Sequence, residues 1–122
     1  MAPVEANIFF VDDNKAALKS GSKLLEALGL HVVETAETLE EAHRKIGELD
    51  KKGVSVVILD GNLTEGDISM RDGKKLAAEI KEAYGDKIVI IGNSSQGPVE
   101  GAHYQKSDIG NTTKLAEFIK KL

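Results

Sequence analysis

Acidic and polar residues stand at the ends of four short apolar runs in the sequence. They are Asp12-Asp13-Asn14, Asp60-Gly61-Asn62, Asn93-Ser94-Ser95 and Gln105-Lys106-Ser107. If a fold brings Asp12, Asp13 and Asp60 together, their charges repel one another unless a cation neutralises them. These hard oxygen donors suit Mg²⁺ with retained waters better than a soft transition metal. An aspartate beside such a metal and a lysine is able to take up a phosphoryl group, because the cations offset the charge of the group in transfer.

The pattern of apolar residues predicts the elements that would position these clusters. Short β-branched runs predict five strands, at 8–11, 31–33, 54–59, 88–91 and 102–105. Apolar residues at helical spacing lie between most of the strands and again after the last one. This alternation predicts a mainly parallel sheet with helices on both faces, and ligands of such sheets bind outside the carboxyl ends of the strands.

The link between the fourth and fifth strands is too short for a helix. It runs from Ser95 to Gly101 and contains Gly97-Pro98, whereas a helical crossover needs at least about 10 residues and tolerates proline poorly. A hairpin is the alternative, but it would carry Lys106 to the far edge of the sheet, so we expect a parallel fifth strand. Without a covering helix, alternate residues of 88–91 would face water, which predicts burial by self-association or by a partner protein.

Composition limits the class of protein. The chain has 122 residues, of which 41% are hydrophobic and 30% are charged, so we expect one globular domain over 1–122. A net charge of -4 argues against direct binding to nucleic acid or to an anionic membrane. The lack of cysteine excludes disulfides, thiolate zinc sites and a cysteine nucleophile. No signal peptide or membrane-spanning run is evident, so a cytoplasmic location is expected.

Four segments resemble, in order and in strand context, the receiver domain of response regulators. The segments are 8–14 (IFFVDDN), 57–63 (VILDGNL), 90–95 (IIGNSS) and 104–106 (YQK), and the resemblance covers nearly the whole chain. It implies a flavodoxin-like three-layer α/β sandwich with a five-stranded parallel sheet in the order 2-1-3-4-5. The fourth helix of that fold would be replaced by a loop.

The resemblance assigns the acceptor and the metal ligands. Asp60 would be phosphorylated, Asp13 would bind Mg²⁺ directly, and Asp12 would act mainly through metal-bound water. The backbone carbonyl of Asn62 looks like the third protein ligand. Taken one at a time, Asp12 and Asp13 also suit a helix cap and Asp60 a turn after a strand. Their joint placement at strand ends favours the functional reading.

The resemblance also assigns the groups around the phosphoryl group. Ser94 would contact it and Lys106 would pair with it, although sliding the strand register by one puts Asn93 or Ser95 in place of Ser94. His103 stands where the family usually has an aromatic switch residue. Such a domain would need Mg²⁺ and a histidine kinase or phosphotransfer protein as phosphodonor. It would catalyse only its own phosphorylation and dephosphorylation, and it would signal through protein contacts.

Three departures from the receiver pattern keep other functions open. The segment between Asp60 and Asp72-Gly73 is longer than usual through 64–69, Ser107 replaces a usual cis-proline, and the fourth helix is missing. One alternative is a degenerate receiver that binds proteins without phosphorylation. Another is a small phosphohydrolase with Asp60 as nucleophile, but Asn62 stands where such enzymes need a second carboxylate.

Overall fold

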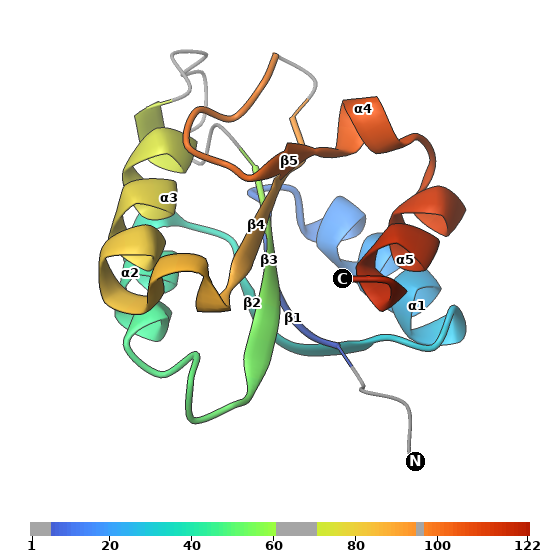
Figure 1. Cartoon of the computed structure of the whole chain (residues 1–122), viewed down its shortest axis with the longest axis horizontal. Helices are drawn as coiled ribbons and strands as arrows, with labels where there is room; N and C mark the ends of the chain where they lie inside the picture. Colours follow the sequence, from blue (N-terminus) through green and yellow to red (C-terminus); the bar gives the residue numbers. More distant parts are fainter. Residues whose placement is uncertain (1–5, 61–70, 95–96) are drawn as a thin grey trace.

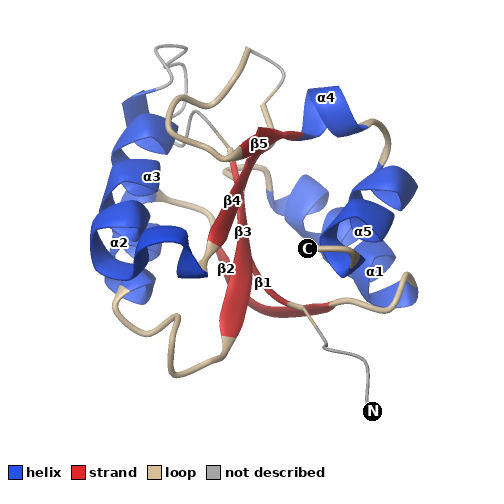
Figure 2. Ribbon diagram, viewed as in Figure 1, coloured by secondary structure: helices blue, strands red, loops and turns tan. Residues whose placement is uncertain are grey.

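Five parallel strands form one sheet in the order β2-β1-β3-β4-β5, as predicted. The computed structural model describes residues 6–60, 71–94 and 97–122. The strands are β1 (Asn7–Val11), β2 (His31–Ala36), β3 (Val54–Leu59), β4 (Val89–Gly92) and β5 (Tyr104–Gln105). Figure 2 shows the sheet edge-on between two layers of helices. The fifth strand runs parallel to β4, so the hairpin alternative is wrong.

Helices cover both faces of this sheet (Figure 1). On one face lie α1 (Lys15–Ala27) and α5 (Thr112–Lys120), and on the other lie α2 (Leu39–Ile46) and α3 (Arg71–Tyr84), which continues into the 3-10 turn η1 (Gly85–Lys87). A four-residue helix, α4 (Lys106–Ile109), directly follows β5. Among the described residues, no helix combines the length and the apolar character needed to cross a bilayer.

Alternating strand residues feed two apolar clusters, one on each face. Phe9 and Val57 pack with Leu76 on the side of α2 and α3. Phe10 and Ile58 pack on the side of α1 and α5. A strand buried on both faces is typical of a parallel sheet, and it explains why the strand sequences are continuously apolar.

The link between β4 and β5 contains no helix in its described residues, 93–94 and 97–103. The predicted exposure of alternate residues of 88–91 is nevertheless wrong, because Ile88 and Ile90 are 2% and 0% exposed. Val99 of the link is 1% exposed and packs in the cluster that contains Ile90 and the α3 residue Ala77. The link itself therefore covers the face that a helix would have covered, and the apolar surface expected to drive homodimerisation is buried within the chain.

Two side chains of the β5 segment hold the link in place. Gln105 accepts a hydrogen bond from the Val99 N–H at 3.0 Å and donates one to the Val99 carbonyl at 2.9 Å. His103 Nδ1 accepts from the Ile90 N–H at 2.9 Å, while the His103 N–H donates to the Ile90 carbonyl at 2.8 Å. Both side chains thus satisfy backbone groups that the short β5 strand leaves without ladder partners.

Candidate functional site

Backbone hydrogen bonds continue the sheet just past the ends of its central strands and so fix the first polar residues there. Asp12 N–H donates to the Ala36 carbonyl at 3.1 Å, and Asp60 N–H donates to the Val11 carbonyl at 3.0 Å. Asn93 N–H donates to the Leu59 carbonyl at 2.9 Å. The three backbones that carry Asp12, Asp60 and Asn93 are therefore held side by side at one edge of the sheet.

The three predicted carboxylates meet at this edge. One oxygen from each of Asp12, Asp13 and Asp60 lies within 4.8 Å of the others. Asp13 is exposed, while Asp12 and Asp60 are partly buried. All the donors are carboxylate oxygens at a spacing that one cation can bridge, which fits a hard divalent ion such as Mg²⁺. Asp12, Asp13 and Asp60 would hold it.

The surroundings of this cluster disfavour the charged form of Asp12. Burial raises the pKa of Asp12 above its ordinary value of 3.8; a hydrogen bond from the Asn14 N–H lowers it, and the negative charge of Asp13 raises it again. Asn14 also accepts a hydrogen bond from Ala17 N–H and so caps α1. Because Asn14 serves as the cap, the two aspartates are not needed for capping, and they are left to face one another.

The predicted serine and lysine lie beside each other at the same end of the sheet. Ser94 and Lys106 line a hollow of about 240 Å³ together with Asn93, Ser107 and Gly110. The hollow suits a small anion, because a lysine and hydroxyl groups surround it.

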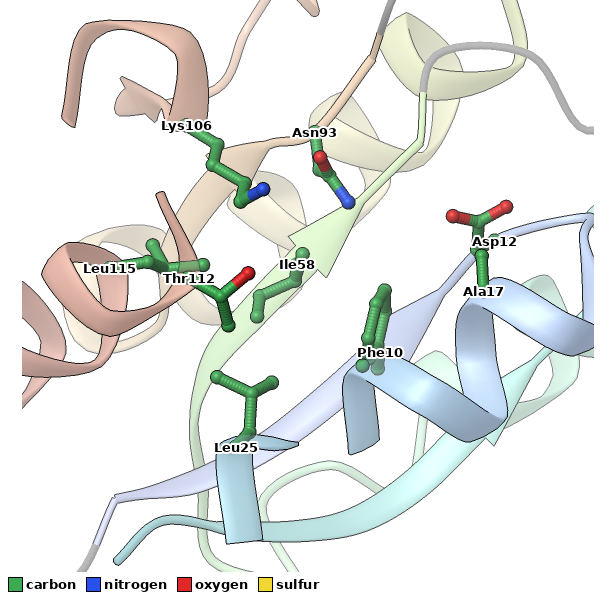
Figure 3. A pocket seen from close by; sticks show the side chains of 10 residues that line it. Phe10, Asp12, Ala17, Leu25, Ile58, Asn93, Lys106, Thr112 and Leu115 are labelled. Atoms are coloured by element: carbon green, nitrogen blue, oxygen red, sulfur yellow. The ribbon is translucent and has the colours of Figure 1, made fainter. Parts of the chain in front are cut away.

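A second cavity connects Lys106 with the acidic edge. Lys106, Asn93 and Asp12 all line a space of about 190 Å³ between α1, α5 and the sheet. In Figure 3 the Lys106 ammonium group and the Asn93 amide point into this space from one side, and Asp12 stands on the other side near Ala17. Sequence reasoning named Asn93 only as an alternative to Ser94. It did not predict Thr112, which lines the same cavity; the one sequence feature that marks Thr112 is its position directly after the helix cap Asn111.

Two further predictions concern Asn62 and His103. Asn62 and the segment 64–69 fall outside the described residues. The Nδ1 atom of His103 accepts a hydrogen bond from the Ile90 N–H, and its Nε2 atom faces Asp86 of η1 at 3.4 Å. In this structure His103 thus serves the β4–β5 link, and its role as a switch stays a prediction.

The sequence matches no family model and no curated protein. Solved structures share its fold over nearly the whole chain. A response regulator receiver domain from Clostridium thermocellum has a TM-score of 0.74 and 25% identity, covering 95% of this chain and 92% of that one. The BeF3-activated DrrB receiver domain has a TM-score of 0.70 and 25% identity, covering 97% of each chain. A chain of the CheX-CheY-BeF3-Mg+2 complex from Borrelia burgdorferi shares the fold, with a TM-score of 0.73 and 18% identity over 95% of this chain and 87% of that one.

The class that this fold and the solved structures define is the CheY-like receiver domain of response regulators. The chain shares the fold of that class, and the described part of its β4–β5 link contains no helix.

Proposed function

We propose that this chain is a response regulator receiver domain whose Asp60 accepts a phosphoryl group in a Mg²⁺-dependent reaction. The observation that carries the proposal is the meeting of Asp12, Asp13 and Asp60 within 4.8 Å. Ser94 and Lys106 line a hollow at the same end of the sheet and supply a hydroxyl group and a positive charge. No enzymatic turnover of an outside substrate is part of the proposal.

The chemistry follows from the groups present. An Asp60 oxygen forms a bond to the phosphorus atom as the bond from phosphorus to the donor's nitrogen breaks, and the nitrogen keeps the bonding electron pair. Lys106 and the Ser94 hydroxyl stabilise charge on the phosphoryl oxygens. A bound Mg²⁺ would supply further neutralisation of that charge. Attack by water on the acyl phosphate later restores the Asp60 carboxylate and releases inorganic phosphate.

The donor and the output are proteins in this proposal. A histidine kinase or a phosphotransfer protein in the cytoplasm would supply the phosphoryl group. Two of the similar structures carry BeF3, one of them with Mg²⁺ in a CheX-CheY complex, and these similarities support a magnesium-dependent phosphoacceptor that works through protein contacts.

A degenerate receiver that binds proteins without phosphorylation is the second candidate. It is favoured by the β4–β5 link, where Val99 and Gln105 form a covering that replaces a helix. Such a surface would present the same face whether or not Asp60 is modified.

Intact mass measurement after incubation with Mg²⁺ and acetyl phosphate separates the two candidates. We expect one added phosphoryl group on the wild type, none on Asp60→Asn, and an unchanged yield for Asp50→Asn, whose side chain is exposed and lies outside the cluster. Omission of Mg²⁺ should abolish the adduct. Absence of any adduct, together with no Mg²⁺ binding, would select the degenerate receiver, and an adduct that survives in Asp60→Asn would refute the assigned acceptor.

A further inference from the structure

The cavity of about 190 Å³ beneath the acidic edge has an apolar floor. The floor is formed by Phe10, Leu25, Ile58 and Leu115. On the α1 side its wall is made of small residues, Ala17 and Gly21. A Cβ at Gly21 would lie 2.7 Å from Phe10 Cε2, so the Phe10 ring rests directly on the helix backbone. For scale, an apolar cavity of about 150 Å³ in another protein is large enough to hold benzene.

The opening of the cavity is polar and asymmetric. Asn93, Lys106 and Thr112 converge on it from the end of β4, from α4 and from α5 (Figure 3). Lys106 is partly buried, and it forms no ion pair with any other residue in the described parts of the chain. Asp12 stands at the α1 edge of the opening, where the Asn14 N–H donates to its carboxylate. The side of the opening away from Asp12 therefore carries a positive charge and hydrogen-bond donors.

We infer that this cavity binds a small carboxylic acid with a compact apolar body. The body, of about six non-hydrogen atoms by comparison with benzene, lies against Phe10 and Leu115. The carboxylate faces Lys106 and Thr112, where a charge-assisted hydrogen bond is about twice as strong as a neutral one. An amine in the same place would meet the Lys106 ammonium group. A concave apolar site with a few convergent polar groups is the usual form of a small-ligand site.

Binding is independent of the proposed phosphorylation, because neither Mg²⁺ nor a phosphodonor takes part in it. One consequence does rest on the proposed function: a ligand that engages Lys106 would slow phosphorylation of Asp60. The binding test below leaves out both Mg²⁺ and phosphodonor, so a failure of the proposed function leaves its result unaffected.

Titration of the full chain with benzoate, followed through backbone amide chemical shifts, tests the inference. We expect saturable shifts centred on the amides of α1 and α5 that border the cavity. Benzyl alcohol, which has the same ring and no charge, should bind about tenfold more weakly, a loss that corresponds to about 1.4 kcal/mol. Acetate and benzylamine should give no saturable shifts. Equal binding of benzoate and benzyl alcohol would overturn the assigned carboxylate site, and the absence of saturable shifts with benzoate would overturn the inference as a whole.

Matched variants locate the site. Ala17→Met fills the cavity and should abolish benzoate binding, while Ala16→Met on the exposed face of the same helix should leave it unchanged. Thr112→Val removes the hydroxyl and should weaken binding several-fold, and the exposed Thr113→Val should not. The Thr112→Val variant keeps the shape of the side chain, so it carries the test if Ala17→Met fails to fold. Wild-type affinity in both cavity variants, or in Thr112→Val alone if Ala17→Met does not fold, would show that benzoate binds elsewhere.

Discussion

The Gln105 side chain brackets the Val99 backbone with two hydrogen bonds, one to its N–H at 3.0 Å and one to its carbonyl at 2.9 Å. The same carbonyl accepts from Ala102 N–H at 3.2 Å, which closes a turn in the link. Val99 is held over β4 in this way, and its side chain fills the space on the α3 side. Since Lys106 follows Gln105 directly, the bracket also fixes the backbone next to the candidate phosphoryl-binding lysine.

Gly92→Ala should disrupt the two hydrogen bonds between the Gln105 side chain and the Val99 backbone. A Cβ at Gly92 would clash with Gln105 Oε1 and would lie 2.8 Å from Val99 Cβ, so both groups must move. We expect the free energy of unfolding to fall by about 1–3 kcal/mol, as for other overpacked sites. Urea denaturation measures the change. Gly47→Ala is the control, because nothing lies within 4 Å of its added Cβ and its φ of -66° suits alanine; it should be neutral or stabilising. Equal stability of the two variants would contradict the close contact at Gly92.

Gln105→Leu keeps the bulk of the side chain and removes both hydrogen bonds. The N–H of Val99, a residue that is 1% exposed, then loses its acceptor, at an expected cost of about 1–3 kcal/mol. Hydrogen exchange provides the specific readout: the Val99 amide should exchange much faster in the variant, while amides in β1 should keep their relative protection. Unchanged protection of the Val99 amide would show that the hydrogen bonds of Gln105 do not hold the β4–β5 link in place.

His103→Phe tests the second side-chain hydrogen bond that holds the β4–β5 link, the one between His103 and the Ile90 backbone. The Phe ring retains the apolar contact but offers no acceptor to Ile90 N–H, which His103 Nδ1 binds at 2.9 Å. We expect a loss of about 1–3 kcal/mol in the free energy of unfolding and faster exchange of the Ile90 amide. His43→Phe removes an exposed pair with Glu79 and should cost about 1 kcal/mol or less. A larger loss at His43 than at His103 would refute this ranking.

Glu34 should make stability depend on pH in the acid range. Burial would raise its pKa, but hydrogen bonds from Lys45 and Lys52 outweigh that effect and lower the pKa to about 2, from an ordinary value of 4.5. A lowered folded-state pKa adds stability that is present above pH 4.5 and is lost as the pH falls toward 2. Glu34→Gln should flatten this part of the stability curve, as measured by urea denaturation at several pH values. Parallel curves for the variant and the wild type would show that Glu34 does not carry the effect.

The strands, the parallel sheet and the meeting of the aspartates were predictable, because they follow from apolar runs and from the geometry of strand ends. The missing helix was also predictable from Gly97-Pro98 in a short link. The packing of the β4–β5 link over β4 was not predictable. Hydrogen bonds from and to Gln105 hold Val99 over β4, and the absence of a side chain at Gly92 leaves room for both residues; such contacts between separate segments leave no periodic pattern in the sequence. Thr112 was missed for the same reason, since helix packing places it in the cavity.

Asp13→Asn should separate the contribution of Asp13 to Mg²⁺ binding from the destabilising repulsion between Asp13 and Asp12. Burial and the charge of Asp13 both act to raise the pKa of Asp12, so in metal-free protein the folded state binds more protons than the unfolded state above pH 3.8, and stability falls as pH rises through that window. Removing the Asp13 charge relieves a repulsion of about 1 kcal/mol. The variant should therefore unfold at higher urea than the wild type without metal. With saturating Mg²⁺ the order should reverse, because ligand binding stabilises only the protein that retains the site. Asp50→Asn, outside the cluster, should respond to Mg²⁺ as the wild type does. A less stable Asp13→Asn in the absence of metal would mean that Asp13 holds the fold rather than the ion.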